Sequence, residues 1–259
     1  MKQQFVEKMD VRIVADKNEM GAAAAAFVAE KIKAAIDEFG HANIIVATGA
    51  SQFEFLNALT KLDGIDWSKV TAFHLDEYKD MSIEHPASFR KYLNERFFDI
   101  VKPAEVHLLN GDAADIESEV QRYENLLKQH RIHIACIGIG ENGHIAFNDP
   151  PVADFNDPKL VKVVELDDAC RRQQLGEGWF PTFDDVPTHA LSLTIPAIMR
   201  AQTISCVVPD ERKARAVHDA LYGKISTACP ASVLRRHEDA LLWLDDAAAS
   251  LLQQKKDKR

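Results

Sequence analysis

Strand-like apolar runs alternate with helix-like segments along almost the whole chain, and this alternation constrains the fold more than any other feature. Several runs are rich in Val and Ile with little polar alternation, which is typical of strands covered on both faces. The predicted strands are residues 11–16, 43–49, 71–78, 133–140, 160–166, 189–195, 203–209 and 240–245. Strands and helices in alternation predict an α/β fold: a doubly wound, mostly parallel open sheet with helices on both faces.

The segments between these runs show helical periodicity. Asn18 is expected to cap a helix that continues through Ala35, and Ser51 to open a second one. Further helices are predicted at 86–98, 114–130 and 210–222. Because there is no internal repeat, no Pro/Gly/Ser-rich linker and no change of composition, we expect one α/β domain over residues 1–259.

Residues 168–188 interrupt the alternation. They contain Gly176, Gly178, Pro181 and Pro187 and show neither a helical nor a strand period. The segment is therefore predicted to be a long loop. Loops of this length in compact α/β domains often cover a functional site, so we expect a lid here, with an inert surface excursion as the alternative.

The charge balance restricts the partners. The chain has 31 Lys and Arg against 40 Asp and Glu, a net charge of −9. An acidic chain of this kind is a poor candidate for binding nucleic acid or a membrane surface, so an anionic ligand needs a local site. The N-terminus is charged where a signal peptide needs an apolar core, and no apolar stretch approaches the ~20 residues of a membrane span.

The four cysteines point to the cytoplasm. They are widely scattered, with no CxxC pair and no nearby His partner, at Cys136, Cys170, Cys206 and Cys229. We expect four small core or rim residues in a reducing compartment, rather than a disulfide framework or a zinc knuckle.

Three predicted strand ends carry unusual residues, and open α/β sheets bind ligands at such ends. The first is the turn Thr48-Gly49-Ala50-Ser51 between a strand and a helix. Small residues before a helix N-terminus expose backbone N–H groups to an anion, and two hydroxyls add donors. The alternative is an ordinary tight turn in which Ser51 is only the N-cap.

The second strand end is Phe73-His74-Leu75-Asp76-Glu77-Tyr78. Adjacent acids at a strand terminus fit a cleft better than a core, and a carboxylate there can act as a general base. A solvated acidic turn is the alternative. His74 and Asp76 share one face of the strand, but no third ligand has suitable spacing, so we expect no metal.

The third strand end contains Gly138, Gly140 and Gly143, which spell the dinucleotide-binding pattern GxGxxG. The pattern does not apply, because Asn148-Asp149-Pro150-Pro151 follows where a helix should continue. Asn142, His144 and Asp149 can instead converge around a glycine turn, with the histidine as a proton shuttle near neutral pH. A purely structural histidine is the alternative.

The motifs TGAS, FHLDEY, EHPASFRKYL and GIGENGHIAFNDP, in this order and spacing, resemble the glucosamine-6-phosphate deaminase (isomerase) family. That family shares its fold with 6-phosphogluconolactonase. The similarity extends from about Asn43 to about Asp245, with LDEY and GHIAFN as its specific elements.

The resemblance implies a single catalytic domain that converts D-glucosamine 6-phosphate to D-fructose 6-phosphate and ammonia without a metal or an organic cofactor. It assigns proton transfer between carbons 2 and 1 to Asp76, with Glu77 beside it, and ring opening to His144, oriented by Asp149 with Asn142 nearby. The expected phosphate ligands are Thr48, Gly49, Ala50, Ser51 and Lys213. Related proteins range from monomers to hexamers, so a homo-oligomer is compatible with the sequence.

Several positions depart from the family pattern. Asn142 stands where some members have Asp, and Asp149 replaces the commoner Glu. The Arg that clamps the phosphate in the lid aligns near Gly176, so Arg171 or Arg172 is expected to substitute for it. No residues match the allosteric effector site of some members. The alternatives are a 6-phosphogluconolactonase-like hydrolase and a non-catalytic sugar-phosphate sensor.

Overall fold

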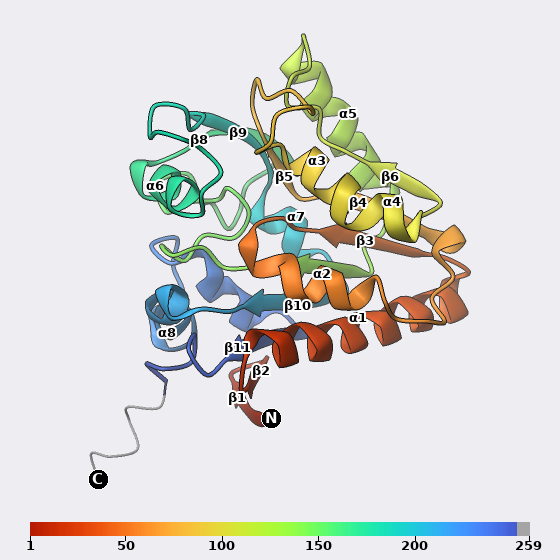
Figure 1. The fold of residues 1–259 in the computed structure, drawn as a ribbon, viewed down its shortest axis with the longest axis vertical. Helices are drawn as coiled ribbons and strands as arrows, with labels where there is room; N and C mark the ends of the chain where they lie inside the picture. The colour runs from red at the N-terminus through yellow and green to blue at the C-terminus, as the bar shows by residue number, and fades with distance from the viewer. Residues whose placement is uncertain (253–259) are drawn as a thin grey trace.

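The computed structural model describes residues 1–252 and contains two sheets (Figure 1). The strands are β1 (Lys2–Val6), β2 (Met9–Val14), β3 (Ala42–Val46), β4 (Val70–His74), β5 (Asp76–Tyr78), β6 (Glu105–His107), β7 (Ile134–Ile137), β8 (Val161–Glu165), β9 (His189–Leu193), β10 (Thr203–Val208) and β11 (Ala240–Asp245). The helices are α1 (Lys17–Phe39), α2 (Phe53–Leu59), α3 (Phe89–Leu93), α4 (Asp99–Val101), α5 (Ile116–Gln129), α6 (Asp168–Gly176), α7 (Ile195–Met199) and α8 (Ala214–Tyr222). The 3₁₀- and π-helical segments are η1 (Ala50–Gln52), η2 (Trp67–Lys69), η3 (Asn94–Phe98), η4 (Glu211–Lys213) and η5 (Pro230–Arg236).

The large sheet has the strand order β1-β2-β11-β10-β7-β3-β4-β6. Only β1 is antiparallel to its neighbour, and the other pairs are parallel. The chain builds outward from β3 through β4 to β6, and then outward from β7 through β10 to β11. The strand order therefore reverses between β3 and β7. The loops that follow these two strands run in opposite directions, so a crevice opens between the loops at the carboxyl ends of the strands.

Both faces of the large sheet are covered, as the unbroken apolar runs predict. In β3, Ile45 packs into one core cluster with α5, α7 and α8, and its neighbours Ile44 and Val46 pack into a second with α1 and α2. Figure 1 shows α1 and α2 side by side on one face of the sheet. The predicted fold class, a doubly wound and mostly parallel sheet, is confirmed.

A second, antiparallel sheet of order β5-β9-β8 was not predicted. The run 71–78 was expected to be one strand, but it breaks at Leu75, where the chain leaves the large sheet and pairs with β9, so that Asp76 faces Ser192. A third apolar cluster, which includes Tyr78, Phe147 and Phe180, lies under this small sheet. The break places the start of β5 where the two sheets meet.

Several boundaries differ from the predicted ones. Asp16, rather than Asn18, caps α1, and its carboxylate accepts hydrogen bonds from two backbone N–H groups of the first turn. The segment 168–188 is not a continuous loop: α6 occupies its first half, with Asp167 as N-cap. Its glycines and prolines begin only at Gly176, so they end the helix rather than prevent it. Among residues 1–252, no helix is long and apolar enough to cross a membrane.

Candidate active site

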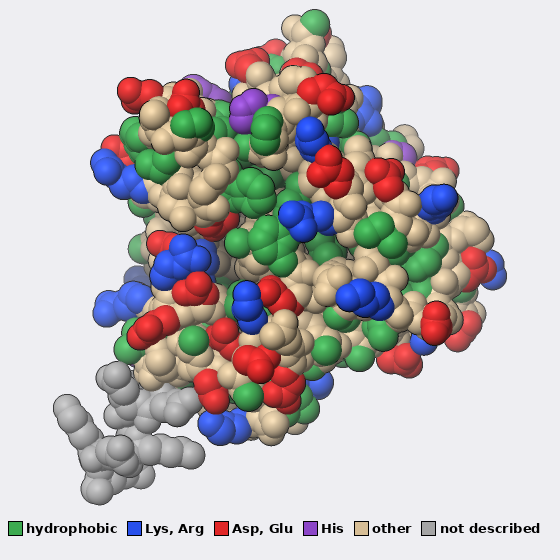
Figure 2. Space-filling model, in the orientation of Figure 1, with side chains coloured by type: hydrophobic (Ala, Val, Ile, Leu, Met, Phe, Trp, Pro, Cys, Tyr) green, Lys and Arg blue, Asp and Glu red, His purple; other side chains and the backbone are tan. Residues whose placement is uncertain are grey.

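A cavity of about 610 Å³ opens at the carboxyl ends of the parallel strands, in the crevice between β3 and β7. This volume is typical of a small-molecule site. The view in Figure 2 shows charged side chains of both signs around a hollow in the surface. The lining contains seven of the twelve residues that the sequence predicted for the proton-transfer groups and the phosphate site. The predicted residues among them are Thr48, Gly49, Ala50, Ser51, Asp76, His144 and Lys213.

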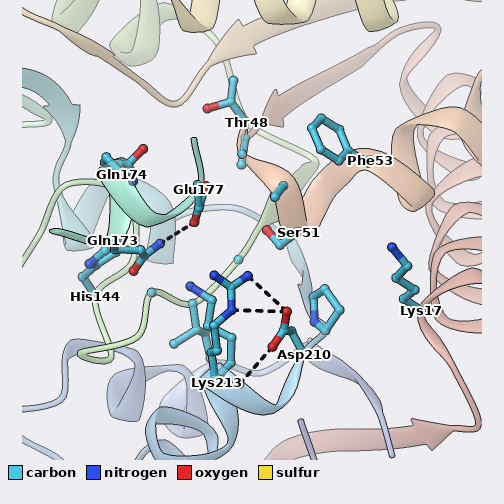
Figure 3. Close-up of a pocket in the computed structure, with 18 of the residues that line it drawn as sticks. Lys17, Thr48, Ser51, Phe53, His144, Gln173, Gln174, Glu177, Asp210 and Lys213 are labelled. Atoms are coloured by element: carbon cyan, nitrogen blue, oxygen red, sulfur yellow. Dashed lines mark hydrogen bonds and ion pairs between the residues drawn. The ribbon is translucent and has the colours of Figure 1, made fainter. Parts of the chain in front are cut away.

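The turn after β3 forms one wall of the cavity (Figure 3). Gly49, which precedes the short turn η1, has φ +95° and ψ 170°. Residues that carry a side chain adopt this backbone conformation only with strain. The Tyr92 hydroxyl donates a 3.0 Å hydrogen bond to the Gly49 carbonyl. The turn thus presents small residues and the two hydroxyls of Thr48 and Ser51 to the cavity, which suits an oxyanion.

Asp76 lies in the cavity wall at the first position of β5 and is 6% exposed. Burial, reinforced by the neighbouring Glu77 carboxylate, raises the pKa of Asp76 to about 8. Within residues 1–252 no hydrogen bond to the Asp76 side chain offsets the cost of burying its charge. A carboxylate with few stabilising partners is a stronger base than a solvated one, and a pKa near the working pH suits a group that both accepts and returns a proton.

Glu77 does not line the cavity. Successive side chains in a strand point to opposite faces, so Glu77 turns away from Asp76 into the protein. There its carboxylate accepts hydrogen bonds from five donors, namely the N–H groups of Tyr78, Phe89 and Arg90, the Ser88 hydroxyl and the Arg90 guanidinium. Glu77 is thus a structural anchor for α3 that also raises the pKa of Asp76.

Glu77→Gln is expected to lower the free energy of unfolding by about 3–5 kcal/mol, because an amide N–H₂ would face buried donors and Arg90 would keep only Asp112 as an ion-pair partner. Urea unfolding measures the change. The exposed Glu84→Gln is the matched control and is expected to stay within about 0.5 kcal/mol of the wild type. Equal stability of the two variants would contradict the anchoring role.

His144 and Asp149 form a buried relay beside the cavity. His144 Nδ1 lies 2.8 Å from Asp149 Oδ1, and Asn142 Nδ2 donates a 2.8 Å hydrogen bond to the same oxygen. The Asn142 side-chain oxygen in turn accepts the His144 N–H at 3.0 Å. Burial alone would raise the pKa of Asp149, but the charge of His144 and the hydrogen bonds from His144, Asn142 and Cys170 outweigh it and lower that pKa. An ionised Asp149 fixes the imidazole and leaves Nε2 for a substrate.

Gly140 makes the position of His144 possible. A Cβ atom at Gly140 would lie 2.2 Å from His144 Nε2, so any side chain would displace the ring. The backbone of Gly140 also donates a 2.9 Å hydrogen bond to the His144 carbonyl. Gly138 and Gly140 also line the cavity, so this glycine turn leaves room for the histidine and for a ligand beside it.

The helix α6 contributes two cavity residues that the sequence did not predict, Gln173 and Gln174, and Glu177, directly after the end of the helix, is a third. Gln173 Nε2 and Trp179 Nε1 both donate hydrogen bonds to the Glu177 carboxylate. Gln174 accepts a 2.7 Å hydrogen bond from the Tyr78 hydroxyl. The available signal was the acidic pair Asp167-Asp168, because an acidic residue can cap a helix and the first glycine of the segment, Gly176, comes only eight residues after Asp168.

The cations that line the cavity are Lys17 at the start of α1, which pairs with Glu54 at 2.8 Å, and Arg212 and Lys213 in the segment that enters α8; none of them comes from α6. Lys213 is buried and lines the cavity, with no ion-pair partner within 4.0 Å among residues 1–252, and burial lowers its pKa. Arg212 also lines the cavity and is held by Asp210 at 3.1 Å. Figure 3 shows Lys213 and Asp210 across the cavity from Thr48.

Arg171 and Arg172, expected as phosphate ligands, are absent from the lining. The Arg171 guanidinium donates to the carbonyls of Phe183 and Val186 and packs over the Phe183 ring. Arg172 is exposed on the outer side of α6 near Asp168. Arg171 and Arg172 are absent from the lining because Gln173 and Gln174 occupy the part of the helix that faces the cavity.

The site offers poor ligands for a metal. His144, Asp149 and Cys170 approach one another within 4.8 Å, but burial and the Asp149 charge keep the pKa of the Cys170 thiol far above its usual range. The thiol therefore stays protonated and acts as a donor to Asp149.

His74 is fully buried, and burial with the Arg90 charge lowers its pKa to about 3, so it is a neutral core residue outside the lining. All four cysteines are free thiols, as predicted.

Comparison with known proteins agrees with this geometry. Residues 15–243 match the family described as glucosamine-6-phosphate isomerases/6-phosphogluconolactonase. A protein from Exiguobacterium sibiricum named glucosamine-6-phosphate deaminase is 39% identical over 207 residues, which are 80% of each chain. A protein of the same name from Listeria monocytogenes is 40% identical over 207 residues, covering 80% of this chain and 86% of its own.

Solved structures give the same result. A monomeric glucosamine-6-phosphate deaminase superposes with a TM-score of 0.84 at 33% identity, over 93% of this chain and 99% of its own. A 6-phosphogluconolactonase from Shewanella baltica has a TM-score of 0.77 at 17% identity, over 93% of this chain and 100% of its own, which is a likeness of fold alone. This chain belongs to the glucosamine-6-phosphate isomerase/6-phosphogluconolactonase family.

Proposed function

We propose that this protein is a glucosamine-6-phosphate deaminase, which converts D-glucosamine 6-phosphate and water to D-fructose 6-phosphate and ammonia. The observation that carries the proposal is the pairing, in one cavity, of a buried carboxyl with a raised pKa, Asp76, and a histidine held by a carboxylate, His144. An aldose–ketose conversion needs these two separate proton-transfer groups. The 39–40% identity to proteins named as this deaminase supports the same substrate.

The proposed reaction begins with opening of the sugar ring. His144 Nε2 moves a proton between the 1-hydroxyl and the ring oxygen, while Asp149, which accepts a hydrogen bond from Asn142, holds the imidazole. Asp76 then removes the proton from carbon 2 of the open-chain sugar and returns it to carbon 1. The C2–N bond becomes an imine, and water adds to it and releases ammonia, leaving the ketone of fructose 6-phosphate. Each proton that is taken up is given back, so the enzyme is unchanged after one turnover.

The phosphate is assigned to the end of the cavity lined by the Thr48–Ser51 turn and Lys213. We add Arg212 in place of Arg171 and Arg172, because its guanidinium lines the cavity. These groups supply local positive charge in a chain of net charge −9. Residues 168–188 are proposed as the cover of the site, through Gln173, Gln174 and Glu177. The fixed phosphate then holds carbons 1 and 2 against Asp76, which lowers the entropic cost of reaction.

Lys213→Gln is expected to raise KM for glucosamine 6-phosphate about 10–100-fold, because one charge-assisted hydrogen bond to phosphate contributes about 1.5–3 kcal/mol. Steady-state kinetics of ammonia release measure the change. Arg172→Gln, which removes an exposed cation outside the cavity, is the matched control and is expected to leave KM unchanged. A KM for the Lys213 variant equal to that of the control would remove Lys213 from the phosphate site.

The proposed function is tested by incubating the purified protein with glucosamine 6-phosphate, galactosamine 6-phosphate and 6-phosphogluconolactone. We expect ammonia from a hexosamine 6-phosphate, and the panel identifies the preferred epimer at carbon 4. Lactone hydrolysis without ammonia would favour the phosphogluconolactonase alternative. Binding of the phosphosugars without any turnover would favour a sensor.

We place the enzyme in the cytoplasm, in keeping with its four free thiols and with the absence of a membrane-spanning helix among residues 1–252. Its small-molecule partner in this proposal is the phosphorylated amino sugar.

A further inference from the structure

A second cluster of potential ligands lies away from the cavity, at the edge of the large sheet. It comprises Glu105 and His107 of β6, the last strand of the sheet, and His130, which directly follows α5. One ligand atom of each residue lies within 4.8 Å of the other two. In Figure 1, β6 and α5 lie next to each other. None of the three residues lines the substrate cavity.

The first two residues already stand at the spacing of two ligands on one metal ion. They are two apart in a strand, so both side chains leave the same face. His107 Nε2 lies 3.3 Å from Glu105 Oε2, close to the ~3.3 Å between two ligand atoms on a tetrahedral zinc ion with ~2.0 Å bonds. Yet Nε2 is a buried atom that has no hydrogen-bond partner among residues 1–252. A buried nitrogen without a partner is costly, and a bound cation would satisfy it.

The hydrogen bond of the third residue leaves its other ring nitrogen for a metal. His130 Nδ1 lies 2.8 Å from the Leu126 carbonyl, which can only accept a hydrogen bond, so Nδ1 carries the proton. The lone pair is then on Nε2. A second-shell bond of this type, from the far ring nitrogen to a carbonyl, is characteristic of zinc-binding histidines.

The two imidazoles are also held in place before any ion binds. The Phe73 ring contacts both, with centroids 4.8 Å from His107 and 5.3 Å from His130. The Tyr123 hydroxyl donates a 2.9 Å hydrogen bond to the His107 carbonyl and so ties β6 to α5. The nearby Arg122 is paired with Glu119 at 2.7 Å, which offsets its repulsion of a cation. Glu105 is 61% exposed and free to close over an ion that enters from solvent.

We propose that Glu105, His107 and His130 bind a divalent transition-metal ion, with Zn²⁺ as the natural occupant. Two imidazoles and one carboxylate suit zinc and exclude Mg²⁺ and Ca²⁺, which take oxygen ligands. Water completes the tetrahedron. The ion joins the exposed edge strand β6 to the end of α5, and its role is to stabilise the fold. The proposal does not depend on the deaminase reaction.

The test is a calorimetric titration of Zn²⁺ into the metal-free protein, without an affinity tag. We expect one equivalent to bind, and Glu105→Gln, His107→Gln and His130→Gln each to weaken binding at least tenfold. Because Glu105 is exposed, its variant is expected to fold normally. Zinc at about 100 times its Kd is expected to raise Tm by about 5–10 °C in the wild type and by much less in the three variants.

Two controls separate this site from others. His218 lies 3.0 Å from an Asp219 oxygen and forms a similar histidine–carboxylate pair, but without a second imidazole. We therefore expect His218→Gln to leave zinc binding unchanged. His144→Gln tests the cluster in the cavity and is also expected to bind zinc as the wild type does. Loss of binding only in the His144 variant, equal binding by all variants, or no binding by the wild type would each overturn the proposal.

Discussion

Asp76→Asn is expected to lower kcat for ammonia release about 10²–10⁴-fold, the contribution of a positioned general base. The amide cannot accept the carbon 2 proton, although it nearly matches the carboxyl in shape. The phosphate groups of the site are untouched, so the substrate is expected to bind with little change in Kd. Kinetics give the turnover, and equilibrium binding gives the Kd. Unchanged turnover would remove Asp76 from the mechanism.

The pH dependence of the wild type gives a second readout of the same residue. The base must be ionised to act, and burial raises the pKa of Asp76 to about 8. We therefore expect kcat/KM to fall as the pH is lowered through about 8, approaching a tenfold loss per pH unit. A profile that is flat between pH 6 and 9 would contradict the assignment of the base.

Stability is expected to change in the opposite direction to activity. The pKa of Asp76 is higher in the folded state than its ordinary value of 3.8, so its proton stabilises the folded protein at low pH, and this contribution is lost as the pH rises through about 8. Asp76→Asn removes the free-energy cost of burying an ionised carboxylate. We expect the variant to be more stable than the wild type by roughly 2–4 kcal/mol at pH 8, and nearly equal to it at pH 4. Such a gain is typical of a residue kept for chemistry at the expense of stability.

His144→Gln is expected to lower kcat/KM about 10²–10³-fold, because the closed ring form then lacks its proton shuttle. The loss is expected to concern ring opening alone. The variant should therefore still exchange the carbon 2 proton of substrate molecules that have opened in solution. Nuclear magnetic resonance in D₂O measures this exchange alongside ammonia release.

Asp149→Asn is the companion variant, since it keeps the size of the side chain but removes the charge that holds the imidazole at 2.8 Å. We expect an intermediate loss and an altered pH profile, because Asp149 acts by orienting His144. A His144 variant with wild-type activity would show that this histidine is only structural.

The fold was largely predictable because buried parallel strands leave a strong signal in a sequence. The run at β3 is buried at every position and Asn43 is its only polar residue, so it is predictable from the sequence, whereas β6 and β1 are not. Both are edge strands with polar residues, so nothing in their composition separates them from loops. The break at Leu75 was also hidden. Its neighbours on both sides are buried, and only the pairing with β9 shows that the chain changes sheets.

Among the site residues, those at strand ends are predictable from topology, whereas Lys213, in the helical turn η4, was predicted only through the family resemblance. Thr48, Asp76 and His144 each follow a strand of the large sheet, and topology alone brings such positions together. Gln173 and Arg212 lie in segments whose rotation toward the cavity depends on packing, which has no local signature. The adjacent residues Asp76 and Glu77 show the same limit of sequence-based prediction. Both are acidic residues at one strand end, but strand alternation places Asp76 in the cavity wall and Glu77 in the protein interior.

The most direct test of this account follows the hydrogen at carbon 2. Glucosamine 6-phosphate carrying deuterium at that carbon is converted by the wild-type enzyme, and the products are analysed by nuclear magnetic resonance and an ammonia assay. We predict equimolar ammonia and fructose 6-phosphate, with the deuterium found at carbon 1 or in the solvent, and a rate at least about 10²-fold lower for the Asp76→Asn variant. Ammonia absent from the wild-type reaction, or formed at the same rate by the variant, would contradict the account.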